Sequence, residues 1–155
     1  MLKEKKAAHL LLKHKKTITL AESCSGGLLC NRLTNISGSS NFLKAGIVTY
    51  SNAAKTKLLK VPSSLIKKYG AVSLSVAEKM AQGARKLFNT DYGIAITGIA
   101  GPTGGTKQKP VGLTFIALAS RKKTTAMKFL FKGSRLKVKQ QAADKALEML
   151  LEFLK

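Results

Sequence analysis

The chain has 155 residues, of which 45% are hydrophobic. This is enough for one domain, residues 1–155, with its own core, and too apolar for a disordered protein. The formal net charge is +21, yet half of the 28 Lys and Arg residues lie in residues 1–80 and half in residues 81–155. That even spacing argues against a nucleic-acid partner, while the charge itself would attract an anionic small molecule.

No apolar run reaches the roughly 18 residues that a membrane span needs, so we expect no membrane association. Residues 3–15 predict an amphipathic helix rather than a signal peptide, because Lys13, His14, Lys15 and Lys16 interrupt its apolar stretch. The two cysteines, without metal-type spacing, fit a reducing cytoplasm.

In chain order, the hydrophobic pattern and the capping residues predict alternating helices and strands. Ser39 or Ser40 is the expected cap of a short helix within residues 37–44, and Ser51 or Asn52 of the helix after it. Such alternation favours a three-layer α/β/α sandwich with a mixed, mostly parallel sheet. The predicted helices are 3–15, 26–36, 51–59, 61–70, 73–88 and 135–154, and the predicted strands are 17–22, 45–50 (expected to be buried), 92–97, 111–120 and 125–131.

Polar residues follow the first three predicted strands. Ser23 ends the first strand within the stretch AESCSGG, Tyr50 ends the second and Thr97 ends the third. In open α/β sheets, ligands bind outside the carboxyl ends of the strands. If the three strands are parallel, these side chains line one crevice.

The residue types limit the chemistry that such a crevice could perform. The two histidines, His9 and His14, lie five apart in the first helix, and Glu22 is the only acid in one of the proposed site clusters. We therefore expect no metal, no cofactor and no Ser-His-Asp triad. Lys55, in the first turn of its helix, could instead serve as a neutral base, since burial and the positive helix end both lower a lysine pKa. A surface lysine is the alternative.

The hydroxyls and the thiol in the strand-to-helix turn each allow two interpretations. Ser23 and Ser25 could cap the helix, or a hydroxyl there could lie where backbone amides hold an oxyanion or a phosphate. Cys24 could be a nucleophile or a small buried residue, and Ser40 could be a cap or a nucleophile. The glycine-rich loop GIAGPTGG could hold an anion, although it lacks the Lys-Ser/Thr ending of a phosphate-binding P-loop.

Together, the segments TLAESCSGG, SGSSNFLKAGIVTYSNAAKTKLL, YGAVS, AITGIAGPTGG and KPVG, in that order, resemble the CinA C-terminal domain family from about Lys5 to Leu154. The chain looks like the stand-alone form of this domain. The resemblance implies the three-layer fold and a metal-independent serine-lysine hydrolysis of nicotinamide mononucleotide to nicotinic acid mononucleotide and ammonia, in pyridine nucleotide salvage. Ser134 and Thr103 stand where the family often has acids. The matching positions are Ser23, Ser40, Tyr50, Lys55, Thr97 and Arg135.

The resemblance also implies roles. Lys55 is expected to be the base, and Ser40 the nucleophile in preference to Ser23. Tyr50 and Thr97 would orient the reacting groups. Arg135 and the backbone around two glycine-containing segments would bind the oxyanion or the phosphate, the segments comprising Ser25, Gly26 and Gly27, and Gly101, Gly104 and Gly105. A homo-oligomer stays open. The alternative function is a nucleotide- or nucleic-acid-associated protein of the competence and DNA-damage response without hydrolase activity.

Overall fold

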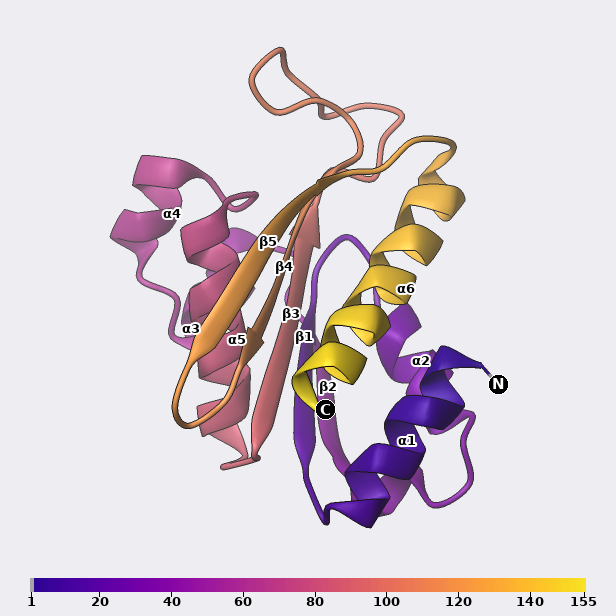
Figure 1. Cartoon of the computed structure of the whole chain (residues 1–155). Coiled ribbons are helices and arrows are strands. Elements are labelled where there is room, and N and C mark those ends of the chain that lie inside the picture. The colour runs from indigo at the N-terminus through magenta and orange to yellow at the C-terminus, as the bar shows by residue number, and fades with distance from the viewer. Residues whose placement is uncertain (1) are drawn as a thin grey trace.

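The computed structural model of the chain describes residues 2–155 and contains one five-stranded sheet, in the order β2-β1-β3-β4-β5. β1, β2 and β3 are parallel, whereas β4 runs antiparallel to both of its neighbours, β3 and β5. The predicted mixed sheet in a three-layer fold is therefore confirmed (Figure 1). The strands are β1 (Ile18–Glu22), β2 (Leu43–Val48), β3 (Tyr92–Gly98), β4 (Leu113–Ala119) and β5 (Thr124–Leu130).

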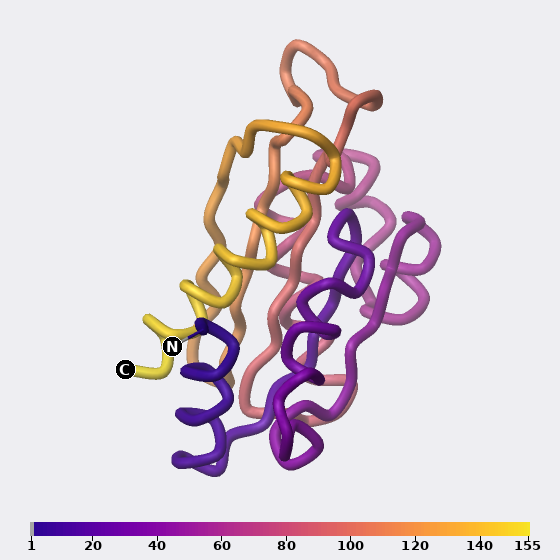
Figure 2. The backbone as a smooth tube through the Cα atoms, turned by 90° about the vertical axis from the view of Figure 1, so that its right-hand side faces the viewer, coloured from indigo at the N-terminus to yellow at the C-terminus, as the bar shows by residue number. Residues whose placement is uncertain are grey.

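Helices cover both faces of the sheet. One face carries α1 (Lys3–Lys13), α2 (Leu28–Thr34) and α6 (Arg135–Phe153), which lie on the side turned toward the viewer in Figure 2. The other face carries α5 (Leu74–Leu87), with α3 (Asn52–Leu59) and α4 (Ser63–Tyr69) packed beside it. A loop between β3 and β4 extends beyond the end of the sheet in both views.

Residue size alternates along the central strands, which sets how closely each helical layer approaches. The face toward α1, α2 and α6 presents large aliphatic side chains such as Leu20, Ile94 and Ile116. The face toward α5 presents small ones, such as Ala95 and Ala117. Because successive strand residues point to opposite faces, the one-residue alternation builds two separate cores, and α5 can pack directly on the alanine-rich face.

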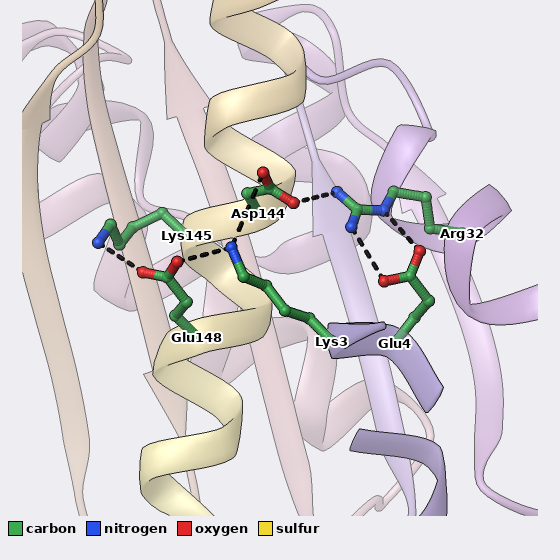
Figure 3. Close-up of polar contacts among 6 residues, drawn as sticks. All are labelled: Lys3, Glu4, Arg32, Asp144, Lys145 and Glu148. Carbon is green, nitrogen blue, oxygen red and sulfur yellow. Dashed lines mark hydrogen bonds and ion pairs between the residues drawn. The ribbon is translucent and has the colours of Figure 1, made fainter. Parts of the chain in front are cut away.

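An ion network joins the helices of the first layer (Figure 3). The Arg32 guanidinium on α2 donates to both carboxylate oxygens of Glu4 on α1, at 3.2 and 3.0 Å, and to Asp144 on α6, at 2.8 Å. Lys3 donates to Glu148 on α6 at 2.7 Å. Forked arginine contacts of this kind are geometrically specific, so the network fixes α1 and α2 against α6. It also occupies three of the seven acidic residues of the chain.

Two local predictions were wrong and two are confirmed. The second strand was expected to be buried, but β2 is an edge strand whose residues alternate between half-buried and exposed. Neither Ser39 nor Ser40 caps a helix. Gly38, at a positive φ of 84°, precedes the 3₁₀ turn η1 (Ser39–Asn41). Ser51 does cap α3 by accepting from the Ala54 amide, and the antiparallel pairing of the last two strands is confirmed. Within residues 2–155, no helix is both long and apolar enough to cross a membrane.

Candidate active site

The carboxyl ends of the three parallel strands surround one polar cavity of about 180 Å³. Ser23 follows β1, Tyr50 follows β2 and Thr97 is near the end of β3, so the predicted meeting of these three residues in one crevice occurs. Lys55 from α3 and Arg135 from α6 add two cations to the lining. The remaining lining residues are Cys24, Asn52, Ala71, Val72, Gly98 and Ala100.

Strand alternation separates the functions of the three consecutive residues at the end of β1. Glu22 points to the α2 face, where its carboxylate accepts from the amides of Leu29 and Cys30 at 3.0 and 2.9 Å. Ser23 points to the opposite face, toward Lys55. Cys24 returns to the α2 face and belongs to that core. Glu22 therefore binds the first turn of α2, and only Ser23 presents its side chain to α3.

Lys55 is a buried base with neutral partners. Its side chain is 1% exposed, and Nζ donates to Ser23 Oγ at 3.1 Å and to the Thr49 carbonyl at 2.8 Å. No carboxylate in residues 2–155 contacts this amine. Burial lowers the pKa of Lys55 below its usual value of 10.5. The geometry thus places an amine with a lowered pKa at hydrogen-bond distance from a serine hydroxyl, the arrangement that a lysine general base needs.

Thr97 fixes another wall of the cavity. It is buried, and its hydroxyl donates to the carbonyl of Ala71 at 3.0 Å. Ala71 and Val72 lie in the segment between α4 and α5 and both line the cavity. Thr97 therefore holds this segment against the end of β3, and its oxygen still has lone pairs available to accept a hydrogen bond.

Arg135 connects two segments at the mouth of the cavity. Its two terminal nitrogens donate to the Gly101 carbonyl at 2.7 Å and to the Tyr50 hydroxyl at 2.9 Å. Both Tyr50 and Arg135 are exposed. Among the described residues 2–155, Lys55 and Arg135 are the cations in the cavity lining. Position 134 is a serine rather than an acid, and its hydroxyl caps α6 by accepting from the Lys137 amide at 3.4 Å.

Ser40 does not lie near Lys55. It belongs to η1, which precedes β2, whereas Ser23 follows the neighbouring parallel strand β1. The two serines therefore lie at opposite ends of the sheet, and Ser40 is exposed there. The preference for Ser40 as the partner of Lys55 is corrected on this ground. The order of the elements could have shown this from the sequence. A residue that precedes one parallel strand lies at the opposite end of the sheet from a residue that follows the neighbouring strand.

The glycines of the two expected anion-binding segments do not line the cavity. Gly26 and Gly27 lie in a separate hollow beside α6, together with Ser25 and Lys139. Gly104 and Gly105 are exposed in the loop that extends beyond the sheet. Gly101 reaches the site only through its carbonyl, which binds Arg135. The positions of these glycines therefore do not support the expected contact between their backbone and an oxyanion.

Burial makes Cys24 a poor nucleophile. Desolvation raises the pKa of its thiol to about 11, so the reactive thiolate is scarce near neutral pH. The sequence also gave no indication of Thr49 or Ala71, because each takes part through a backbone carbonyl. Within residues 2–155, no group of three His, Cys, Asp or Glu side chains is arranged to hold a metal ion.

Comparison with known proteins gives one consistent family. The model of the CinA C-terminal domain matches residues 2–154. A CinA-like protein from Syntrophus aciditrophicus is 54% identical over 148 residues, covering 95% of this chain and 35% of that protein. A CinA-like protein from Endomicrobium trichonymphae is 47% identical over 144 residues, covering 93% of this chain and 34% of that protein. The chain thus spans about a third of the length of these curated relatives.

Solved structures agree with the sequence matches. The competence or damage-inducible protein from Enterobacter asburiae has a TM-score of 0.95 at 33% identity, covering 99% of this chain and 96% of that one. The competence/damage inducible protein CihA from Agrobacterium tumefaciens has a TM-score of 0.92 at 34% identity, with coverage of 99% and 96%. The fold is therefore shared along nearly the whole chain.

Proposed function

The chain belongs to the CinA C-terminal domain family, and we propose that it hydrolyses the amide of nicotinamide mononucleotide to nicotinic acid mononucleotide and ammonia. The observation that carries this proposal is the buried contact between Ser23 Oγ and Lys55 Nζ, 3.1 Å long, without a carboxylate to hold the lysine charged. Serine-lysine pairs perform acyl transfer without histidine or metal.

In the first half of the reaction, Ser23 attacks the amide carbon. Neutral Lys55 takes the hydroxyl proton as the new C–O bond forms, which gives a tetrahedral oxyanion. The ammonium form of Lys55 then returns that proton to the amide nitrogen, the C–N bond breaks and ammonia leaves. In the second half, a water attacks the ester of Ser23, Lys55 again takes and returns a proton, and the acid is released.

Backbone amides directly after the nucleophile are suited to stabilise the oxyanion. Within residues 2–155, the amide of Cys24, which lines the cavity, donates to no backbone carbonyl, whereas the amide of Ser23 donates to Ile96 and that of Gly26 to Ser23. Free, fixed donors of this kind stabilise developing charge without reorganisation. We assign the oxyanion to the amide of Cys24.

The cavity volume and the position of Arg135 suggest how the nucleotide lies. About 180 Å³ is less than the 300–1,000 Å³ of pockets that enclose whole drug-sized ligands. The carboxamide end of the substrate would enter the cavity, while ribose and phosphate lie at the mouth beside Tyr50 and Arg135. A guanidinium there provides a forked partner for phosphate.

The direct test is to incubate the purified protein with nicotinamide mononucleotide and to measure ammonia and nicotinic acid mononucleotide in equal amounts. Nicotinamide riboside, which lacks the phosphate, serves as the comparison substrate. We expect release from the nucleotide, and loss of that release in Ser23→Ala and Lys55→Met variants. No product from the wild-type protein, or undiminished product from both variants, would reject the proposal.

A further inference from the structure

A second hollow, far from the candidate active site, is lined only by polar and cationic residues. It has a volume of about 420 Å³ and lies where β4 turns into β5, beside the last turn of α5. We call it the basic hollow; it is lined by Gln82, Arg85, Lys86, Ser120, Arg121, Lys122, Lys123 and Thr124. Because Ala119 pairs with Gly93 near the start of β3, this hairpin lies at the opposite end of the sheet from Thr97. Figure 1 shows the hairpin at the lower end.

The fold brings together basic side chains that are distant in sequence. Arg85 and Lys86 lie in the last turn of α5, while Arg121, Lys122 and Lys123 lie in the hairpin turn. The turn is fixed by Ser120, whose hydroxyl accepts from the amides of two of its lysines, at 3.2 and 3.1 Å. The even spacing of bases along the chain, which argued against a nucleic-acid partner, does not persist in space.

The positive charge in the basic hollow is not neutralised. Arg121 donates to the Asn89 side chain and Arg85 to the Thr90 carbonyl, both of which are uncharged acceptors. Among residues 2–155, none of the five bases forms a salt bridge. Asp91, which also lies at this end of β3, is already bonded to Thr17 and paired with Lys16. A polyanion would therefore find five unneutralised cations in one place.

We propose that the basic hollow binds the phosphate backbone of a nucleic acid. Protein–nucleic acid interfaces are polar and strongly positive, and no apolar residue lines this hollow. Leu87 and Phe88, which follow Lys86, are exposed but do not line the hollow. An anionic membrane surface would need apolar anchors within the basic surface itself, and a protein partner would need an aromatic or aliphatic centre there. Because the described residues that line the hollow include no aromatic side chain for base stacking, the contacts would be to phosphates and independent of sequence. This inference does not depend on the proposed amide hydrolysis.

The test measures how binding depends on salt, by fluorescence anisotropy of a labelled 20-base-pair DNA duplex. Contacts to five phosphates give a slope of about −4.5 in log K against log salt concentration. The triple variant Arg121→Ala, Lys122→Ala, Lys123→Ala should reduce this slope by about 3 in magnitude. The matched control is Lys5→Ala, Lys6→Ala, Lys13→Ala, which removes the same charge from exposed positions on α1 and should leave the slope nearly unchanged.

Three results would overturn the proposal. The wild-type protein could fail to bind the duplex at low salt. Both triple variants could lose slope equally, which would mean that net charge alone drives binding. The duplex could be ignored while inorganic triphosphate or anionic phospholipid vesicles bind through the same three residues. Circular dichroism and thermal unfolding of both variants ensure that any loss is not a loss of fold.

Discussion

Removal of the Ser23 hydroxyl should abolish turnover, whereas removal of the Ser40 hydroxyl should not. Ser23→Ala deletes the oxygen that lies 3.1 Å from Lys55 Nζ and leaves the backbone pairing of Ser23 with Ile96 intact. Ser40→Ala makes the same chemical change at an exposed residue at the opposite end of the sheet. The two variants are therefore a matched pair that differ only in position.

The structure sets the expected magnitudes. β1 has five residues, and at about 3.3 Å per residue Ser23 lies roughly 16 Å along the strand direction from the level of η1. A hydroxyl at that distance cannot exchange a proton with Lys55, so Ser40→Ala should change turnover by less than about twofold. Loss of a serine nucleophile costs about 10⁶-fold in a well-studied protease. For Ser23→Ala we expect at least ~10⁴-fold, which corresponds to roughly 5.5 kcal/mol in the barrier.

Single-turnover ammonia release measures the rates, and mass spectrometry of quenched enzyme locates the acyl ester. Trypsin cleaves after Lys16, Arg32 and Lys44, so the two serines fall in separate peptides, residues 17–32 and 33–44. The ester should appear on the first peptide. Three results together would refute the assignment of Ser23 from its place at the strand end. Ser40→Ala would be inactive, Ser23→Ala would keep more than a hundredth of the rate, and the ester would lie on the second peptide.

The remaining predictions concern the groups around this serine. Because an ammonium cannot take a proton, kcat/KM should rise with pH until Lys55 is neutral, with a midpoint below 10.5; a midpoint at or above 10.5 would contradict this. Since its folded pKa is depressed, Lys55 makes the wild-type protein gain stability as pH rises toward 10.5, a gain that thermal melts of Lys55→Met should lack. Glu22→Gln should lower the free energy of unfolding by about 1–3 kcal/mol in urea titrations, because the amide retains one acceptor oxygen for two N–H groups. Arg135→Lys should raise KM for nicotinamide mononucleotide more than for nicotinamide riboside, and equal effects would remove Arg135 from phosphate binding. Activity should survive exhaustive chelation, and recovery that requires an added divalent ion would disprove metal independence.

Much of this architecture could be predicted from local pattern. Helix spacing and caps located the elements, and the parallel arrangement of the first three strands followed from their alternation with helices. Lys55 could be singled out because the first turn of α3 follows the strand that ends before Tyr50. The edge position of β2 could not be predicted, since it depends on strand order, which neighbouring residues do not determine. Backbone acceptors such as the Thr49 carbonyl carry no sequence signal at all.

The assignment of Ser40 shows a different limit. Its family match made it the preferred nucleophile over Ser23, but neither this match nor its hydroxyl says at which end of the sheet it lies. That information is in the chain direction: in a parallel sheet, the residue before one strand and the residue after its neighbour are separated by the full strand length. The order of elements therefore carries more weight than motif membership when two candidate nucleophiles compete.

The stretch AESCSGG contains several polar side chains because residues at the end of β1 point to both faces of the sheet. With a period of two, Glu22 and Cys24 point toward α2, and Ser23 points toward α3. The carboxylate is needed where the first amides of α2 lack partners, and the hydroxyl is needed where Lys55 arrives from the other layer. Exchange of Glu22 and Ser23 would leave composition unchanged but direct a carboxylate at Lys55. The carboxylate would then stabilise the ammonium form, so the lowered pKa of Lys55 depends on the order of these two residues as much as on their presence.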